Sequence, residues 1–485
     1  MPATCDTLIR GATLLDGSGA PAQRLDLAIE GDRIAAIGPD LRLQASATVD
    51  ADGLCLSPGF IDSHTHDDLA VIRDPAMTPK ITQGVTTVIV GNCGISASPV
   101  TLRGTLPDPM NLLGAAPEFR FPTFTAYAAA VSAAHPAVNV AALIGHTALR
   151  NNHMERLDRP ATPAEISAMR AQLHEALQAG ALGLSSGLAY LSAHAATTEE
   201  VLAVAQPLAI EGGIYATHLR SESDSILEAM QEAFTIGRAT HAPVIVSHLK
   251  CAGVDHWGQS PEVLHALDQA RQSQPVACDC YPYAAGSSTL DLRQVDDRVT
   301  IAITWSDPHP EAAGRTLADI ARDWHLTQLE AAQRLQPAGA IYHSISEDDM
   351  RRILRHPATM IGSDGLPCDP RPHPRLWGTF PRVLGRYVRE HNLFSLPQAI
   401  HKMTAMPAAR YSLEHRGLLR EGHFADLVLF DPDRILDRAT FADPVQPSEG
   451  ILAVWVNGAL SSTPHQPASG RSGRFLRRGK TKWIQ

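Results

Sequence analysis

The pattern of apolar and polar residues divides the chain into a long central part and two similar ends. Near the N-terminus, residues 25–38 ("LDLAIEGDRIAAIG") place Gly31-Asp32 between two apolar runs. This pattern predicts short strands joined by a tight hairpin turn. A similar pattern of short apolar runs and turn residues is found near the C-terminus in "ADLVLFDPD" and "GILAVWVNGAL". We therefore expect residues 1–58 and 414–475 to pair into one small β-sandwich.

The central part alternates strand-like apolar runs with amphipathic helical stretches. Residues 162–180, "TPAEISAMRAQLHEALQAG", have the apolar spacing of a helix. Alternating strands and helices indicate a parallel sheet, and eight strand candidates in series predict a (β/α)8 barrel over residues 59–413. The eight candidates are "GFIDSHTH", "VTTVIVGNCG", "VNVAALIGHTAL", "GALGLSSG", "GIYATHLR", "APVIVSHLK", "PVACDCYPY" and "ATMIGSDG".

Two gaps between strand candidates are too long for a single helical connection. One follows "GNCG". The other separates the seventh candidate from the eighth, and we assign its surplus to an insertion at about residues 285–345. Long loops of this kind usually serve a functional site, so the insertion is expected over the barrel mouth. The predicted fold is thus α/β: a TIM-like barrel with an insertion over its mouth and a small β-sandwich built from both chain ends.

Charge and composition narrow the class of protein. The chain has 485 residues, of which 44% are hydrophobic, and a net charge of −10. The negative charge argues against a nucleic-acid partner, because nucleic-acid binders are basic. No apolar run approaches a membrane span, and the N-terminus has no signal-peptide pattern. The seven cysteines follow no disulfide spacing. A cytoplasmic protein without a membrane partner is expected.

The strand ends carry the candidate chemistry. His64 and His66 are two residues apart, so both point to the same side of a strand. In a barrel of this kind the C-terminal strand ends surround the active site. One strand-end histidine alone is more often a packing residue, but six metal-competent residues at corresponding positions argue for a shared site. Their nitrogen, thiolate and carboxylate donors suit Zn²⁺. The six are His64, His66, Cys93, His218, His248 and Asp364.

Several stretches resemble one particular family. "PGFIDSHTHDD" resembles the entry motif of the metal-dependent amidohydrolase superfamily. Together with "GVTTVIVGNCG", "YATHLRSE", "YPYAAGSST", "GSDGLPCDPRPHPRLWGTFPRVLG" and "ADLVLFDP", it is similar to the N-acyl-D-amino-acid deacylases, or D-aminoacylases. The resemblance implies an enzyme that hydrolyses the linear amide bond of N-acyl-D-amino acids and releases a carboxylic acid and a free D-amino acid.

The resemblance also implies roles for the metal ligands. Cys93, His218 and His248 would hold one tight zinc ion. His64, His66 and Asp364 would surround a second, weaker position, with Cys93 able to bridge the two. Asp364 would be the catalytic proton-transfer residue.

Other family positions correspond to substrate-binding residues. The clamp for the substrate α-carboxylate corresponds to Lys250, Tyr281 and Arg375, with Ser287 nearby, and Tyr190 would line the pocket. An Arg-Lys-Tyr set can hold a carboxylate through charge-assisted hydrogen bonds. The resemblance implies that the substrate is the D-enantiomer. The chemistry of the residues alone does not distinguish D from L.

The side-chain preference of the enzyme stays open. His343, Ser344 and Ile345 stand where relatives that act on hydrophobic substrates have bulky apolar residues. Arg293, in "STLDLRQVDDR", would face an acidic substrate side chain, although a solvated loop arginine is the more common case. The alternative function is therefore a deacylase specific for N-acyl-D-glutamate or N-acyl-D-aspartate. A less favoured alternative is a cyclic-amide hydrolase of the hydantoinase or dihydropyrimidinase type. The expected partner is a small-molecule substrate, and the protein would be a monomer or a small homo-oligomer.

Overall fold

Short parallel strands form the centre of the computed structural model, which describes residues 4–480. They make two ladders, β6-β7-β8 and β9-β10-β11-β12-β13-β17, and each described pairing within them is parallel. Every predicted strand segment contains at least one of these strands. The strands are β6 (Phe60–Asp62), β7 (Val85–Val90), β8 (Asn139–Ala142), β9 (Ile144–Gly145), β10 (Gly183–Gly187), β11 (Ile214–His218), β12 (Val244–Val246), β13 (Val276–Cys280) and β17 (Thr359–Ile361).

The edge strands β17 and β6 meet without a regular ladder. A parallel bridge joins Thr65 to Gly365, and the Ser63 N–H donates to the Ile361 carbonyl at 3.4 Å. Both contacts lie at or just beyond the strand ends. We call this meeting of β17 and β6 the joint. At the other edge, β8 and β9 are separated by Leu143 alone.

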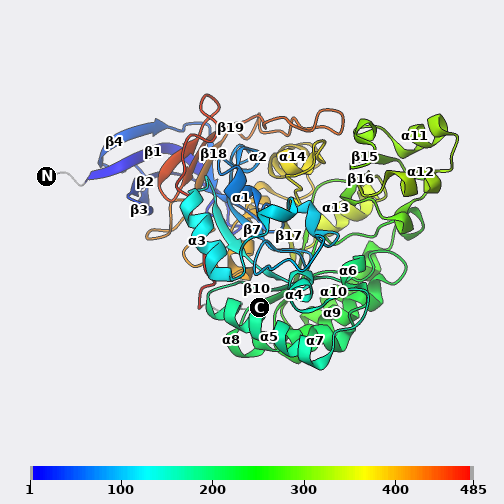
Figure 1. Ribbon diagram of the computed structural model, residues 1–485. Coiled ribbons are helices and arrows are strands. Elements are labelled where there is room, and N and C mark those ends of the chain that lie inside the picture. Colours follow the sequence, from blue (N-terminus) through cyan, green and yellow to red (C-terminus); the bar gives the residue numbers. More distant parts are fainter. Residues whose placement is uncertain (1–3, 481–485) are drawn as a thin grey trace.

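Helices cover the outer side of the strands (Figure 1). The predicted helix at 162–180 is present as α5, which begins after a Thr162 capping box with Pro163 in its first turn. None of the helices within residues 4–480 has the length and apolar character needed to cross a membrane. The helices are α1 (Ala70–Arg73), α2 (Thr78–Ile81), α3 (Phe124–Ala134), α4 (His146–His153), α5 (Pro163–Gln178), α6 (Leu191–His194), α7 (Thr198–Ala205), α8 (Pro207–Glu211), α9 (Ile226–Thr240), α10 (Ser260–Arg271), α11 (Leu317–Trp324), α12 (Gln328–Leu335), α13 (Glu347–Arg355), α14 (Arg375–Arg382), α15 (Leu396–Met403) and α16 (Ala405–Arg410).

Successive strand residues pack on opposite sides, as the two-residue period of a strand requires. Ile61 and Ile245 belong to a cluster formed by the inward-facing residues of several parallel strands. Their neighbours Phe60 and Val244 belong instead to the large cluster between strands and helices. Apolar residues therefore fill both sides of the strands, and polar residues gather where the strands end.

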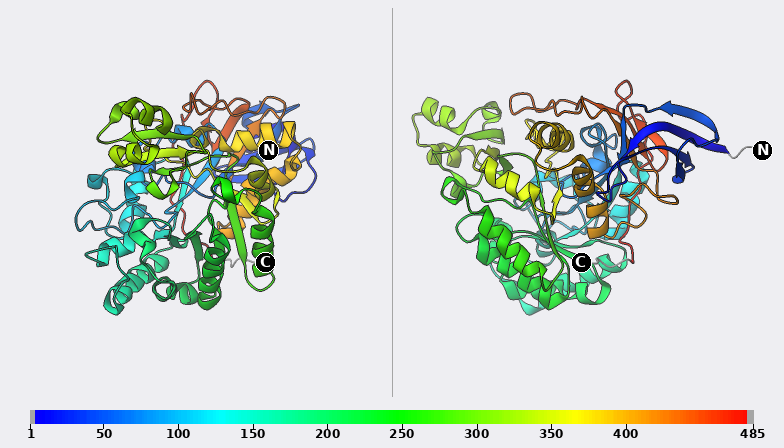
Figure 2. Two further views of the ribbon diagram at one scale, coloured as in Figure 1. Left: turned by 90° about the vertical axis from the view of Figure 1, so that its right-hand side faces the viewer. Right: turned by 180° about the vertical axis from the view of Figure 1, so that it is seen from behind.

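The two chain ends meet in a separate sheet. β18 pairs antiparallel with both β5 and β19, so C-terminal strands extend the N-terminal sheet. The right-hand view in Figure 2 places this sheet on one side of the parallel strands. Its strands are β1 (Thr4–Leu14), β2 (Gln23–Glu30), β3 (Arg33–Gly38), β4 (Gln44–Asp50), β5 (Cys55–Pro58), β18 (Leu427–Phe430), β19 (Ile451–Val456) and β20 (Ala459–Ser462).

The long gap between β13 and β17 folds into a small unit with its own apolar core. Its three strands, β14 (Gly286–Thr289), β15 (Ile301–Ser306) and β16 (Ala338–Tyr342), pair antiparallel and carry α11 and α12. Their apolar side chains form a cluster separate from that of the parallel strands. Figure 2 shows this unit at the opposite end of the molecule from β1–β4.

Candidate metal centre and substrate cavity

The strand ends bring six predicted residues into two overlapping groups. Donor atoms of the first group lie within 4.8 Å of one another, and the same limit holds for the second. Cys93 belongs to both groups. Parallel strands in chain order explain the convergence, because their C-terminal ends all point the same way. The first group is His64, His66, Cys93 and Asp364, and the second is Cys93, His218 and His248.

Cys93 lies between imidazoles from two other strands. Its Sγ is 3.2 Å from His64 Nε2 and 3.3 Å from His248 Nε2. Burial favours the neutral thiol, but His64 and His248 hold the Cys93 pKa well below its ordinary value. Cys93 is therefore a thiolate, the form that binds metals.

Three of these residues adopt strained backbone conformations. Cys93, His248 and Asp364 have φ angles of 54°, 35° and 50°. Positive φ is unfavourable for residues with a Cβ and persists where the surrounding structure enforces it, often at functional sites. The strain turns each side chain at the point where its strand has ended.

Carboxylates hold the outer nitrogens of two histidines. Asp279 Oδ2 lies 3.3 Å from His64 Nδ1, and Glu222 Oε1 lies 3.0 Å from His248 Nδ1. In both histidines the other ring nitrogen, Nε2, faces Cys93, and Lys250 Nζ also lies 2.9 Å from His248 Nδ1. A carboxylate beside the outer nitrogen is the usual arrangement of metal-binding histidines in proteins.

The donor set fits zinc. One thiolate, several imidazoles and one carboxylate are ligands that Zn²⁺ favours. In addition, His218 Nδ1 is buried without a hydrogen-bond partner within the described chain. A buried nitrogen in that state is costly, and a bound cation would satisfy it.

Asp364 connects the metal ligands to a buried arginine. Its Oδ1 lies 3.2 Å from His66 Nε2, and its Oδ2 lies 2.9 Å from Arg375 Nη1. Burial would raise the pKa of Asp364, but Arg375 and then His248 hold it well below its usual range. Asp364 is therefore ionised at neutral pH and can accept a proton.

A cavity of about 810 Å³ adjoins the metal ligands and contains the predicted carboxylate clamp. Arg375 is 1% exposed, and its guanidinium stacks over the Tyr281 ring at 4.7 Å. Arg375 Nε, Tyr281 Oη and Ser287 Oγ are all buried without a hydrogen-bond partner among the described residues. These three donors line one cavity, so an anionic ligand group there would satisfy them together.

Lys250 is also in this cavity, but it already has a carboxylate partner. Its Nζ donates to Glu222 Oε1 at 2.5 Å and to the His248 carbonyl at 3.2 Å. Glu222 thus links the lysine to the outer nitrogen of His248. Tyr190, at the cavity wall, packs against His218 with ring centroids 4.7 Å apart.

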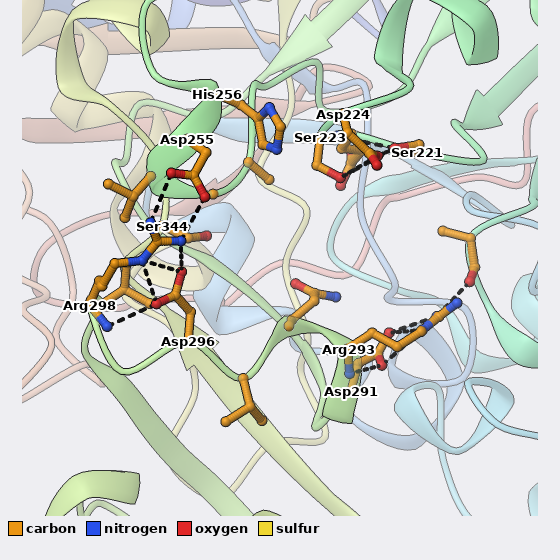
Figure 3. Close-up of a pocket in the computed structure, with 18 of the residues that line it drawn as sticks. Ser221, Ser223, Asp224, Asp255, His256, Asp291, Arg293, Asp296, Arg298 and Ser344 are labelled. Atoms are coloured by element: carbon orange, nitrogen blue, oxygen red, sulfur yellow. Dashed lines mark hydrogen bonds and ion pairs between the residues drawn. The ribbon is translucent and has the colours of Figure 1, made fainter. Parts of the chain in front are cut away.

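Arg293 lies at the rim, where a second pocket of about 940 Å³ joins the cavity. Figure 3 shows Arg293 folded back onto Asp291. Its Nη2 also donates to the Ala189 carbonyl at 2.9 Å, and the side chain is 49% exposed. Across the same pocket, Arg298 joins Asp255 and Asp296 (Figure 3). The rim arginine is thus engaged by the chain itself.

Sequence reasoning missed three polar residues around the site: Asp279, Glu222 and Lys80. Strand alternation gave a signal for Asp279, since it points to the opposite side from its buried neighbours Cys278 and Cys280. Glu222 follows His218 by four residues in a loop, and no periodicity marks it. Lys80 is on a one-turn helix between β6 and β7, and its partner Ser363 is 283 residues away in the sequence.

Comparisons with known proteins agree with this site. The model of the Amidohydrolase family matches residues 47–461. The chain is 50% identical to an N-acyl-D-aspartate deacylase of Alcaligenes xylosoxydans xylosoxydans, covering 100% of this chain and 97% of that protein. A D-aminoacylase crystal structure superposes with a TM-score of 0.96 at 46% identity, covering 98% of this chain and 100% of the other. An N-acyl-D-glutamate deacylase of Bordetella bronchiseptica, complexed with zinc and a phosphonate inhibitor, gives a TM-score of 0.94 at 46% identity, with the same coverage.

The chain therefore belongs to the amidohydrolase family, with the α/β, TIM-barrel type of fold found in its structural neighbours. Within that family it belongs to the D-aminoacylase group.

Proposed function

We propose that the protein is a zinc-dependent deacylase that hydrolyses the linear amide bond of N-acyl-D-amino acids. The observation that carries this proposal is the cavity in which three unpartnered buried donors lie beside two groups of metal-competent residues. The donors suit the substrate α-carboxylate, and the metal groups suit its amide. Relatives named for D-aspartate, general D-amino-acid and D-glutamate substrates support the D-configuration.

The proposed division of the ligands is the one that the family resemblance implies. Cys93, His218 and His248 would hold the tight zinc ion, while His64, His66 and Asp364 would hold a weaker second ion with Cys93 between them. When bound, zinc polarises the amide carbonyl and lowers the pKa of a water molecule towards neutrality. The depressed pKa of Cys93 and the carboxylates beside the outer nitrogens of His64 and His248 suit these side chains to binding a cation.

Asp364 carries the proton in this mechanism. Its ionised carboxylate accepts a proton from the attacking water, and the resulting acid donates that proton to the leaving amine nitrogen. Arg375 holds Oδ2, which leaves Oδ1, beside His66 Nε2, to face the reaction. Arg375, Tyr281 and Ser287 meanwhile fix the substrate α-carboxylate, with Lys250 supplying further positive charge. Fixing both the carboxylate and the amide restricts how the substituents at the α-carbon can be placed.

The side chain that the enzyme prefers on its substrate is a separate question. The residues at the cavity rim support both an acidic and a neutral side chain. Arg293 is the rim cation that would recognise an acidic side chain, which favours N-acyl-D-aspartate or N-acyl-D-glutamate. Its engagement with Asp291 and the Ala189 carbonyl favours a neutral side chain, since those bonds would have to be exchanged. We place the broad D-aminoacylase activity first. A cyclic-amide hydrolase is less favoured, because the two metal groups share a cysteine, Cys93, as the sequence resemblance to the deacylases implies.

The architecture we propose follows the sequence prediction. In this proposal residues 59–413 form the (β/α)8 barrel, with an insertion at its mouth over about residues 285–345. Residues 4–58 and 414–475 form a small β-sandwich, and residues 1–3 of its predicted range lie outside the described residues. The parallel pairings, the separate apolar core of the insertion and the β5–β18 pairing support this division. A small-molecule substrate and a cytoplasmic location remain the predicted setting.

A panel of N-acetyl amino acids tests the function. Purified, zinc-loaded protein is assayed with both enantiomers of apolar, acidic and aromatic substrates, beside a hydantoin. The proposal expects turnover of D-enantiomers only. Hydantoin hydrolysis without deacylation would show that the cyclic-amide alternative is right. A D-aspartate or D-glutamate substrate that exceeds N-acetyl-D-methionine by more than about tenfold in kcat/KM would assign acidic specificity.

A further inference from the structure

The joint between β17 and β6 carries much of the site but has few backbone hydrogen bonds. His64 and His66 follow β6, and Asp364 follows β17. Across the joint, the Asp364 N–H donates to the His64 carbonyl at 2.7 Å, and the His66 N–H donates to the Gly365 carbonyl at 3.0 Å. These backbone bonds lie at or beyond the strand ends and form no regular ladder, so side-chain contacts there add to what keeps the two segments in register.

A fully buried ammonium group occupies that position. Lys80, in α2, is 0% exposed. Its Nζ donates to Asp62 Oδ2 at 2.8 Å, to Thr65 Oγ1 at 2.9 Å and to Ser363 Oγ at 2.8 Å. An ammonium has three N–H donors, and all three are used. Asp67 Oδ2 lies 3.2 Å from the same nitrogen.

The partners of Lys80 lie on both sides of the joint. Asp62, Thr65 and Asp67 belong to the segment that carries the two histidines, and Ser363 directly precedes Asp364. Asp62 adds two more bonds across the joint, since it accepts from the Ser363 N–H at 2.8 Å and from Ser363 Oγ at 2.6 Å. The space is tight as well: a Cβ on Gly365 would lie 3.0 Å from Lys80 Nζ.

We infer that Lys80 is a positioning residue of the metal site, which fixes the backbone of Asp364 relative to that of His64 and His66. Lys80 acts through Asp364 and touches neither substrate nor metal. Cys93, His218 and His248 come from β7, β11 and β12, and none of them contacts Lys80. Loss of Lys80 should therefore affect proton transfer and the second metal position, and should spare the tight zinc ion.

A second buried lysine provides a matched control. Lys402 is 5% exposed, and its Nζ donates to the His356 carbonyl at 2.5 Å and to the Thr359 carbonyl at 3.1 Å. It thus contacts the start of β17, whereas Lys80 contacts the segment beyond the end of the same strand. Lys402→Met removes a second buried ammonium, one that makes no hydrogen bond to the joint.

The first measurement is zinc binding by metal-free protein, titrated with zinc alone. Lys80→Met should keep the tight equivalent and weaken the second by at least about tenfold, because its ligands lose their common anchor. Lys402→Met should bind both equivalents as the wild type does. Unchanged second-site affinity in Lys80→Met would overturn the inference. This readout does not depend on the proposed deacylase activity.

The second measurement is a kinetic double-mutant cycle, which rests on the proposed function. Lys80→Met should lower kcat by at least about tenfold, since a displacement of about 1 Å at a reacting group can cost 10²-fold. In the Asp364→Asn background the same change should cost less than about threefold, because the group that Lys80 positions is already lost. Equal losses in both backgrounds would show a general structural role. If the wild type hydrolyses no N-acyl-D-amino acid, the proposed function is refuted. The positioning role of Lys80 is then tested by the zinc titration alone.

Ser363→Ala is the variant to use if Lys80→Met does not fold. It removes one acceptor of the ammonium and leaves the buried charges paired. It should show the same pattern at smaller size: a weaker second zinc equivalent, a lower kcat and an unchanged tight equivalent. A Ser363→Ala protein identical to the wild type in all three would overturn the inference.

Discussion

Replacing Arg375 by lysine separates charge from shape in the proposed clamp. The wild-type guanidinium pairs with Asp364 through Nη1, donates to the Ser287 carbonyl through Nη2 at 2.9 Å, and leaves Nε for a ligand. A lysine keeps the positive charge, but its single ammonium group cannot contact Asp364, the Ser287 carbonyl and the ligand in the same geometry. We expect it to keep the Asp364 pair and to lose the bonds to Ser287 and to the ligand. At about 1.5–3 kcal/mol per hydrogen bond to a charged group, the ligand bond alone corresponds to roughly 10- to 100-fold in kcat/KM.

The assay compares an N-acetyl-D-amino acid with its C-terminal amide in both proteins. Wild-type kcat/KM should fall steeply when the carboxylate becomes an amide, and Arg375→Lys should show a much smaller difference. Arg293→Lys is the matched control, because Arg293 lies at the rim of the same cavity and is bound to Asp291. It should change kcat/KM for apolar substrates by less than about threefold. If Arg375→Lys and the wild type lose the same factor on carboxylate removal, Arg375 does not bind that group and the clamp is wrongly assigned.

The metal ligands and one distant ion pair give three further tests. Cys93→Ala should lose most of the tightly bound zinc, about one ion per chain, in metal analysis, and full retention would make Cys93 a packing residue. Asp364→Asn should keep that zinc but lose about 10²- to 10⁴-fold in kcat; turnover within a few-fold of the wild type would exclude Asp364 as the proton carrier. Glu200→Gln, which leaves the fully buried Arg150 without its carboxylate, should cost about 3 kcal/mol of unfolding free energy at neutral pH. Burial opposes ionisation of Glu200, but His146, the Ala161 N–H and Arg150 lower its pKa to about 2. Because the folded pKa is depressed, this stability is present above about pH 4.3 and is lost as pH falls towards 2, so urea melts of wild type and variant should converge in acid. A difference that stays constant with pH would contradict this account.

The arrangement of the parallel strands could be predicted because two simple regularities act together. Parallel strands alternate their side chains, and their C-terminal ends share one edge, so strand-end residues such as His64, Cys93 and His248 are expected to meet. In the structure the same alternation packs Cys278 and Cys280 among apolar residues and turns Asp279 towards His64. Predictions of this kind need only local periodicity and chain order.

Contacts made by loops and by one-turn helices could not be predicted in this way. Glu222 reaches Lys250 and His248 from a loop whose path has no periodicity, so its position depends on the completed fold. The pairing of Arg293 with Asp291 is the opposite case. The two residues are two positions apart, and a local ion pair was open to prediction. Because Arg293 is already paired with Asp291, this ion pair affects which substrate side chain the rim can bind.

The difference between Lys80 and Lys402 shows why burial alone does not reveal a role. Both ammonium groups are buried, and nothing in their sequence surroundings separates them. Lys402 donates to carbonyl oxygens at and just before the start of β17, whereas Lys80 contacts groups from both segments that carry metal ligands. Lys80 and Ser363 are far apart in the chain and meet only where the last parallel strand returns to the first. A site built at the C-terminal ends of parallel strands depends most on that return, because the other neighbouring strands are held by ladders. Lys80, which joins the two segments by side-chain hydrogen bonds where no regular ladder extends, therefore acts on the geometry of Asp364. Through Asp364 it acts on the proton transfer that the proposed mechanism requires.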